Sequence, residues 1–294
     1  MYSQAVSKFL NFCSIYSFNP LDINETLLLR FISYLSGLNL APTTVRVYLS
    51  GIRAWLINQG LQPPSFYSQR IIWAIRAMER NAPCQTRVKP FSQAMFWLIL
   101  PVLYPSYNNI AYFCAMLVGY FGCLRAAEYT VAPGSTQPLL PSHLRIVNSN
   151  PPHAVLRILS SKTSHHGFDV VFGCTNTPVC AVCWLRVMLS TRPLPPLAPL
   201  FALRDGTLIS RSLLAQFMQG ALRAAGVDPS GFSPHSLRAG AATDAAGLGY
   251  SESQIQALGR WRSNAYRVYI RPSQTQQASL ASGLASATSR VHLP

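Results

Sequence analysis

The sequence predicts a mainly α-helical fold with a small antiparallel β-sheet, arranged as a helical domain over residues 1–85 and an α+β domain over residues 86–294. Apolar residues recur at helical spacing along most of the chain. Three short strand-like runs, LRIVNS, AVLRIL and FDVVF, lie close together between residues 144 and 172. The segment NAPCQTRVKPFS at 81–92 has two prolines and no apolar periodicity, so we expect the domain boundary within it.

The N-terminal domain is expected to consist of four helices, over Ser3–Tyr16, after Asn24, after Pro42 and over Ser68–Arg80. In the third helix an apolar stripe should face the core. It consists of Val45, Leu49, Ile52 and Leu56.

The opposite side of this third helix carries hydroxyls and arginines but no acidic residue. Its members are Thr43, Arg46, Ser50 and Arg53, with Thr44 beside them. Hydroxyl and guanidinium groups are suited to contact with a DNA backbone. A plain solvated face is the alternative, although such a face usually carries some glutamate as well.

The second domain should contain both helices and the small sheet. Helices are expected near 92–104, 109–122, 178–190, 210–225, 234–247, 251–258 and 263–270. The apolar segment NIAYFCAMLVGYFGCL at 109–124 runs directly into Arg125. Because a membrane span needs about 20 apolar residues, this segment is interpreted as a buried helix.

The charge balance points to nucleic acid as a partner. The chain has 24 Lys plus Arg against 9 Asp plus Glu, a net charge of +15, and its only lysines are Lys8, Lys89 and Lys162. Arginine grips phosphate through two parallel hydrogen bonds and stacks on bases. Because 49% of residues are hydrophobic and only 11% are charged, the chain is expected to be a packed globular protein and not a disordered basic tail.

The seven cysteines show no framework spacing and suggest reduced thiols in an intracellular compartment. Cys174, Cys180 and Cys183 could suggest zinc, but no second CxxC pair completes four ligands, so no metal site is expected. Residues 1–20 lack a signal-peptide pattern, and secretion is not expected.

The stretch FSPHSLRAG at 232–240 combines groups that favour an anion. Ser233 and Pro234 should begin a helix. His235 then lies in its first turn, and Arg238 lies one turn further along the same face. Free backbone N–H groups, the helix dipole and a guanidinium would converge there, and a phosphate is the natural ligand.

Three more segments carry candidate functional groups. GCLRAAE at 122–128 places Glu128 three residues after Arg125, where it could brace the guanidinium, and SSKTSHHG at 160–167 places Lys162 between two expected strands. ALGRWRSNAYRVYIR at 257–271 supplies Arg260, Trp261, Tyr266, Tyr269 and Arg271. Each residue taken alone also fits an ordinary structural role.

In this order, the segments resemble the active site of the tyrosine recombinases, the phage-integrase family. The resemblance is closest to the recombinases of DIRS-type retrotransposons and Crypton-like mobile elements, whose C-terminal segment reads approximately HSxRxGAAT…LGRWxSxAYxxYIR. Here it reads HSLRAGAATDAAGLGYSESQIQALGRWRSNAYRVYIR. The match covers essentially the whole chain and is specific at the C-terminal end, but it is loose before residue 120. It implies a core-binding domain followed by a catalytic domain.

The resemblance implies that DNA strands are cut and rejoined through a 3′-phosphotyrosyl intermediate. Tyr269 would be the nucleophile, with Tyr266 as a less favoured candidate because its place often holds another aromatic residue in relatives. Arg125 and Arg238 would clamp the phosphate, and His235 would assist proton transfer or donate a hydrogen bond to the same phosphate.

Lys162 would be the general acid for the leaving 5′ oxygen. Trp261, or Arg260 beside it, would touch the phosphate. Many relatives carry histidine in place of Arg260, so which of the two side chains makes this contact is left open. No cofactor and no metal ion are expected. The partner would be double-stranded DNA, bound by a homotetramer, and a eukaryotic host would place the protein in the nucleus.

A regulator without chemistry is the rival interpretation. AAGLGYSESQIQALGRW at 245–261 also fits a helix-turn-helix. A regulator has no reason to carry Arg125, Lys162 and Tyr269 in this order. A domesticated, inactive recombinase is the other alternative.

Overall fold

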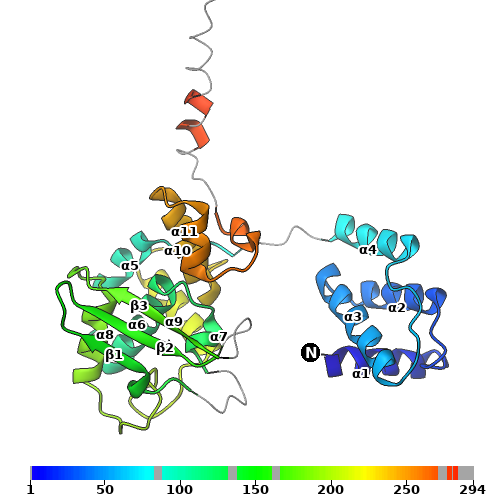
Figure 1. Cartoon of the computed structure of the whole chain (residues 1–294), viewed down its shortest axis with the longest axis horizontal. Coiled ribbons are helices and arrows are strands. Elements are labelled where there is room, and N and C mark those ends of the chain that lie inside the picture. The colour runs from blue at the N-terminus through cyan, green and yellow to red at the C-terminus, as the bar shows by residue number, and fades with distance from the viewer. Residues whose placement is uncertain are drawn as a thin grey trace, which may run out of the picture. The chain divides into compact units, whose positions relative to one another are not determined.

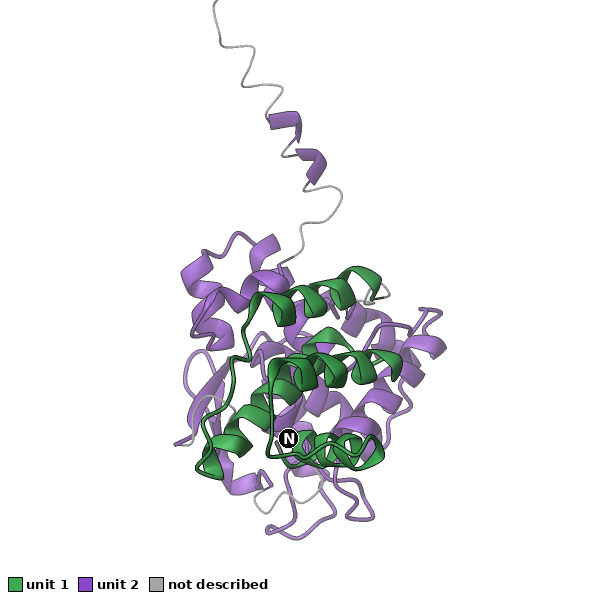
Figure 2. Cartoon of the chain, turned by 90° about the vertical axis from the view of Figure 1, so that its right-hand side faces the viewer, with its two compact units in different colours: residues 1–86 green, residues 87–294 purple. Residues whose placement is uncertain are grey.

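The computed structural model describes residues 2–82, 88–131, 138–160, 166–270, 277–279 and 281–283. The chain forms two compact units, residues 1–86 and 87–294, which Figure 2 distinguishes by colour. Each unit has its own hydrophobic core. The predicted fold class, mainly helical with one small antiparallel sheet, is confirmed.

The N-terminal unit contains four helices among its described residues (Figure 1). They are α1 (Tyr2–Ile15), α2 (Glu25–Gly37), α3 (Pro42–Asn58) and α4 (Gln69–Asn81). Side-chain caps explain where two of them begin, because Asn24 accepts a hydrogen bond from the N–H of Leu27 and Ser68 accepts one from the N–H of Ile71.

Helix α3 has the two faces that its sequence predicts. Its apolar stripe is buried, and Thr43, Arg46, Ser50 and Arg53 are exposed, while Thr44 is half-buried. Glu79 of α4 contacts this polar face, with its Oε1 2.6 Å from Nη2 of Arg46. The polar face of α3 therefore has an acidic neighbour from α4, which the sequence of α3 alone does not show.

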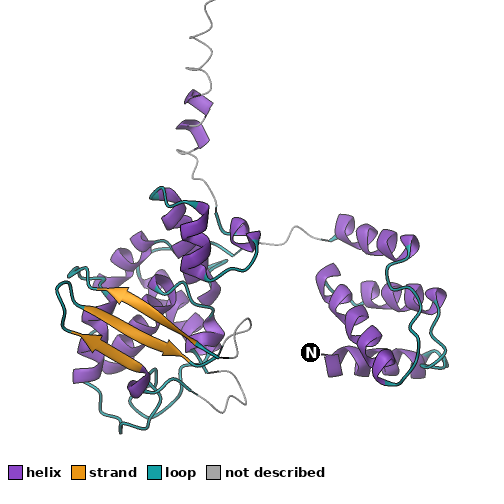
Figure 3. Ribbon diagram, in the orientation of Figure 1, coloured by secondary structure: helices purple, strands orange, loops and turns teal. Residues whose placement is uncertain are grey.

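The C-terminal unit combines helices with a three-stranded sheet (Figure 3). Its longer helices are α5 (Gln93–Ile99), α6 (Tyr107–Phe121), α8 (Ala181–Ser190), α9 (Arg211–Ala224), α10 (Pro234–Gly247) and α11 (Glu252–Gly259). Short helical turns are η1 (Leu100–Val102), α7 (Ala126–Tyr129), η2 (Pro141–His143) and η3 (Asn264–Val268).

The sheet has the order β1 (Leu144–Val147), β2 (His153–Ile158) and β3 (Phe168–Gly173), and both pairs are antiparallel. One face joins the core through Leu156, Ile158, Val170 and Phe172, whereas Arg157 and Asp169 face outward. In β2 and β3, Ile158 pairs with Phe168, so the chain between them forms the connection of a β-hairpin.

Helix α6 lies in the core of the C-terminal unit. Nine of its residues between Ala111 and Tyr120 are buried. This confirms the prediction of a buried helix. No helix in the described part of the chain has the length and hydropathy needed to cross a membrane.

Helix α10 packs very closely on the segment before α5. A Cβ atom at Gly240 would lie 1.8 Å from the carbonyl oxygen of Phe91, so only glycine fits at this position. Phe91 also donates its backbone N–H to the carbonyl of Ser236 at 2.9 Å. These contacts fix the helix that carries His235 and Arg238.

The helix expected near 263–270 is present, but it is the short 3₁₀ helix η3 and ends before Tyr269. Tertiary contacts of its aromatic residues, described below, hold it in this shorter form.

Candidate active site

The candidate active site is built on the first turns of α10. Pro234 is the first residue of the helix, and Ser233 precedes it in an extended conformation. The hydroxyl of Ser236 accepts a hydrogen bond from the N–H of Ser233 at 3.0 Å. His235 and Arg238 follow at a spacing of three residues, which places them on neighbouring positions of one helix face.

Arg238 is buried and held by main-chain atoms. The residue is only 1% exposed. Nη1 donates to the carbonyl of Cys123 and Nη2 to the carbonyl of Gly259, each at 2.6 Å. The guanidinium also lies 4.2 Å from the ring centroid of Trp261, a cation–π distance. Its position is therefore fixed without any bound substrate.

Arg260 reaches the same place from the end of α11. Its backbone adopts the left-handed conformation (φ 55°, ψ 40°) that ends this helix. Its guanidinium donates to the carbonyls of Leu258, Gly122 and Cys123 at 3.1–3.2 Å. It also lies 4.5 Å from the ring centroid of Phe168 on β3. Arg238 and Arg260 thus share the Cys123 carbonyl as an acceptor.

Arg125 is braced by Glu128, as their spacing predicts. Nη1 of Arg125 lies 2.9 Å from Oε1 of Glu128, whose Oε2 accepts the backbone N–H of Arg125 at 2.8 Å. The same Oε2 lies 3.8 Å from Nη2 of Arg260. The carboxylate is 2% exposed and the Arg125 side chain is 26% exposed. Glu128 therefore holds two arginines, and Arg125 stays accessible from outside.

Tyr269 faces His235 across the site. Its hydroxyl oxygen lies 3.0 Å from Nε2 of His235, and the two rings form an edge contact with centroids 5.3 Å apart. The ring of Trp261 lies 5.7 Å from that of Tyr269. Because Trp261 also contacts Arg238, it joins the tyrosine to the arginine cluster.

Tyr266 points elsewhere. It is 1% exposed, and its hydroxyl donates to Oε2 of Glu252 at 2.8 Å. The same carboxylate oxygen pairs with Arg267 at 2.7 Å. Within the described part of the chain, Tyr269 is thus the tyrosine that contacts His235, and Tyr266 packs η3 against α11.

The electrostatics of the site favour an anion and a neutral imidazole. Burial lowers the pKa of His235 below its ordinary value of 6.5, and the positive charges of Arg238, Arg211 and Arg125 lower it further. Burial also lowers the pKa values of Arg238 and Arg260, yet guanidinium groups stay charged in proteins. The site therefore presents fixed positive charge next to a histidine that is able to accept a proton.

The described residues of the C-terminal unit do not include the remaining predicted residues. Lys162 and Arg271 lie outside the described residues, and Lys162 belongs by sequence to the connection between β2 and β3. The candidate DNA-binding residues of α3 belong to the N-terminal unit. The catalytic and DNA-binding roles of all these residues stay predictions.

Four residues of the site were not identified from the sequence. Thr243 donates its hydroxyl to the carbonyl of Tyr269 at 2.6 Å. Thr243 lies eight positions after His235 on α10, so helical spacing could have placed it near the side of the helix that carries His235. Phe168 and Cys123 gave no such signal, because their contacts with Arg260 and Arg238 join distant parts of the sequence. The same holds for Arg211, whose charge acts on His235.

Neither a protein-family model nor a curated protein matches this sequence. Solved structures do match. XerH site-specific recombinase bound to palindromic difH substrate, in a post-cleavage complex, is similar with a TM-score of 0.63 at 16% identity, over 89% of this chain and 70% of that chain.

Two integrases are also similar. The Tn1549 transposon integrase in complex with circular intermediate DNA gives a TM-score of 0.56 at 11% identity, over 89% of this chain and 85% of that chain. A lambda integrase dimer bound to a COC′ core site gives 0.54 at 15% identity, over 92% of this chain and 87% of that chain. With its helical unit, its small sheet and its arginine-rich centre, the chain has the fold of the tyrosine recombinases.

Proposed function

We propose that this protein cuts and rejoins double-stranded DNA through a covalent bond between Tyr269 and a 3′ phosphate, in the integration or excision of a mobile element. The observation that carries the proposal is the pair of Tyr269 and His235, 3.0 Å apart, beside two arginines fixed before any substrate binds. The sequence resemblance and the fold support the same reaction class.

In the proposed first step, Oη of Tyr269 attacks the phosphorus of a DNA phosphodiester. An oxygen–phosphorus bond forms to the tyrosine, and the bond to the 5′ oxygen breaks. The phenol proton passes to Nε2 of His235, and the leaving 5′ oxygen takes up a proton, for which Lys162 is the predicted donor. A 5′ hydroxyl from a second strand then attacks the phosphotyrosine and restores the tyrosine, so the bond energy is kept.

The arginines supply the stabilisation that this step needs. The pentacoordinate transition state carries extra negative charge on its nonbridging oxygens, and fixed cations stabilise such charge best. The side chains of Arg125 and Arg260 are similarly accessible, 26% and 25% exposed, and both are suited to a direct clamp. Arg238 acts from a deeper position. Trp261 keeps the ring of Tyr269 and the guanidinium of Arg238 in place.

The DNA-bound form is proposed to be an assembly of several copies. Strand exchange needs more than one cut, and each chain supplies a single Tyr269. The structures of similar fold include complexes with DNA, one of them a dimer. A homotetramer on two paired DNA sites, in the nucleus of a eukaryotic host, completes the proposal.

A suicide substrate tests the reaction. A pool of duplexes with random central sequence carries one nick, so that cleavage releases a short fragment and traps the covalent product. The full chain is incubated with this pool without added divalent cations, and the denatured products are separated by mass. We expect a protein–DNA adduct whose peptide map places DNA on Tyr269. DNA binding without any adduct would instead favour a non-catalytic binding protein.

A further inference from the structure

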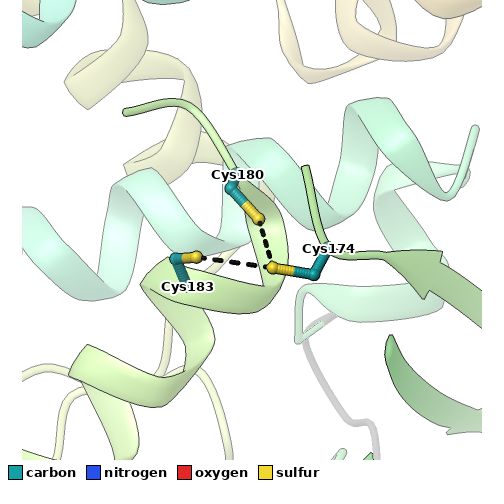
Figure 4. A group of neighbouring side chains, drawn as sticks. All are labelled: Cys174, Cys180 and Cys183. Atoms are coloured by element: carbon teal, nitrogen blue, oxygen red, sulfur yellow. Dashed lines mark hydrogen bonds between the residues drawn. The ribbon is translucent and has the colours of Figure 1, made fainter. Parts of the chain in front are cut away.

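Three cysteines that the active site does not use converge at one end of the sheet. Cys174 directly follows β3, Cys180 precedes α8 as its N-cap, and Cys183 lies in the first turn of α8. Figure 4 shows their side chains directed toward a common point. They are the only group of three or more cysteine, histidine or acidic side chains in the described part of the chain with ligand atoms this close.

The distances between the sulfur atoms fit a metal ion. Sγ of Cys174 lies 3.6 Å from Sγ of Cys180 and 3.7 Å from Sγ of Cys183, and all three lie within 4.8 Å of one another. A disulfide bond would require about 2.0 Å, so these are free thiols. Zinc–sulfur bonds of about 2.3 Å at tetrahedral angles separate two sulfur ligands by about 3.8 Å. Two of the three separations match this value closely.

The backbone forms the turn that brings the cysteines together. Asn176 adopts a left-handed conformation (φ 51°), and the N–H of Cys180 donates to the carbonyl of Thr177 at 3.0 Å. The N–H of Thr175 points at Sγ of Cys180, 3.3 Å away. An N–H donor aimed at sulfur stabilises the anionic thiolate, which is the form that binds metals.

We propose that Cys174, Cys180 and Cys183 bind one zinc ion through their thiolates. Thiolate ligands select zinc, copper(I) or iron–sulfur clusters, and the near-tetrahedral spacing of the sulfurs favours zinc. Since no fourth protein ligand joins the group among the described residues, water or a ligand from elsewhere completes the coordination. This replaces the expectation from sequence that the three cysteines bind no metal.

The zinc ion has a structural role in this proposal. It ties the end of β3 to the start of α8, two elements that also pack against each other. The opposite end of β3 begins with Phe168, which packs on Arg260. Zinc therefore stabilises the strand that supports the arginine cluster, although it takes no part in the reaction.

Metal content tests this proposal independently of any DNA reaction. The full chain is produced with zinc in the medium, dialysed in a reducing buffer without chelator, and analysed for metals by mass spectrometry. We expect one zinc per chain. Replacement of zinc by cobalt(II) should give thiolate charge-transfer absorption and the intense visible bands of a tetrahedral site.

Variants identify the ligands. Cys174→Ser and Cys183→Ser should each lose most of the zinc and melt at a lower temperature, with the circular dichroism of a folded protein retained. Cys13→Ala, which removes a buried thiol from the N-terminal unit, should keep the zinc. A full chain that takes up no zinc, that contains copper or iron instead, or that keeps its zinc after Cys183→Ser would overturn the proposal. A disulfide among the three cysteines, detected as a loss of two hydrogens in the intact mass under reducing conditions, would overturn it as well.

Discussion

The hydroxyl oxygen of Tyr269 lies 3.0 Å from Nε2 of His235. A tyrosine has a pKa near 10, so at neutral pH it needs a partner that takes its proton as it attacks. His235 is suited to this role because burial and nearby arginines keep its pKa below the ordinary value of 6.5. Under the proposed function, this contact favours Tyr269 as the nucleophile and His235 as the group that accepts its proton.

Replacing the nucleophile should separate binding from chemistry. Tyr269→Phe should retain DNA binding, because only one hydroxyl is lost, but form no covalent adduct. Tyr266→Phe is the matched control and should keep both. Since Tyr266 is buried and bonded to Glu252, this control should destabilise the fold by about 1 kcal/mol. Gel separation of trapped adducts and thermal melting measure the two effects, and DNA attached to Tyr266 would contradict the assignment.

Loss of a clamping arginine should slow cleavage strongly. Arg125→Ala should reduce the rate of adduct formation by about a hundredfold or more, because a preorganised donor is lost. Arg238→Ala should slow cleavage as much and also destabilise the fold, since the Gly259 carbonyl loses the Arg238 donor and the Cys123 carbonyl keeps only its bond from Arg260. Arg192 donates to the carbonyls of Leu200 and Ala198, so Arg192→Ala provides a control that affects stability but not the rate. Single-turnover rates measured well below each melting temperature make the comparison.

The rate of cleavage should depend on the protonation of His235. Protonated His235 cannot accept the phenol proton, so at low DNA concentration the rate should fall as the pH drops through the pKa of the free enzyme. Because this pKa is lowered, the fall should lie below pH 6.5. Arg211→Ala removes one of the charges that lower the pKa and should move the fall to higher pH. Initial rates of adduct formation between about pH 5 and 8 give the profile, and a midpoint above 6.5 in the unaltered protein would count against the role of His235.

The tight turn before Trp261 should be essential for activity. In Gly259→Ala, the new Cβ would lie 1.8 Å from a ring carbon of Trp261, so the indole must move away from Arg238 and Tyr269. We expect a loss of adduct formation with DNA binding retained. Gly220→Ala in α9 is the matched control. Nothing lies within 4 Å of its new Cβ, so it should stabilise the helix by about 0.5–1 kcal/mol and leave the rate unchanged. Equal activity of the two variants would argue against a positioning role for Trp261.

The arginines of α3 should contribute to DNA affinity without affecting chemistry. Arg53→Ala should weaken binding to all duplexes and reduce the slope of log affinity against log salt concentration by about 0.9, the value for one phosphate contact. Glu79 pairs with Arg46, so Glu79→Gln should free that guanidinium and strengthen binding. Fluorescence anisotropy at several salt concentrations measures both changes. A slope near zero for the unaltered protein would exclude binding through phosphate contacts.

Local chemistry made much of the fold predictable. The beginnings of α2, α4 and α11 follow from the capping side chains of Asn24, Ser68 and Ser251, whose hydrogen bonds involve residues three positions away. The three strands follow from short apolar runs. The short 3₁₀ form of η3 does not follow from the local pattern, because it depends on the contacts of Tyr266 with Glu252 and of Tyr269 with Thr243.

The site residues could be predicted only where they belong to motifs whose order along the chain resembles that of the tyrosine recombinases. Arg125, His235, Arg238 and Tyr269 could be identified in this way. The cation–π contact of Arg260 with Phe168 could not, because these two residues are far apart in sequence. The spacing of Cys174, Cys180 and Cys183 suggests a group, but the close approach of their sulfurs also depends on the left-handed turn at Asn176, which the sequence does not predict.

The Cys123 carbonyl helps to decide how Arg238 is held in place. Cys123 adopts a left-handed backbone (φ 45°), and its oxygen accepts hydrogen bonds from both Arg238 and Arg260. In the described part of the chain, Arg238 donates only to main-chain oxygens and pairs with no carboxylate. Its hydrogen bonds to neutral carbonyls do not cancel its positive charge, which suits the phosphate contact of the proposed function. The position of this cation is thus set by main-chain carbonyls, so a substitution at Cys123 that keeps the backbone path should leave Arg238 in place.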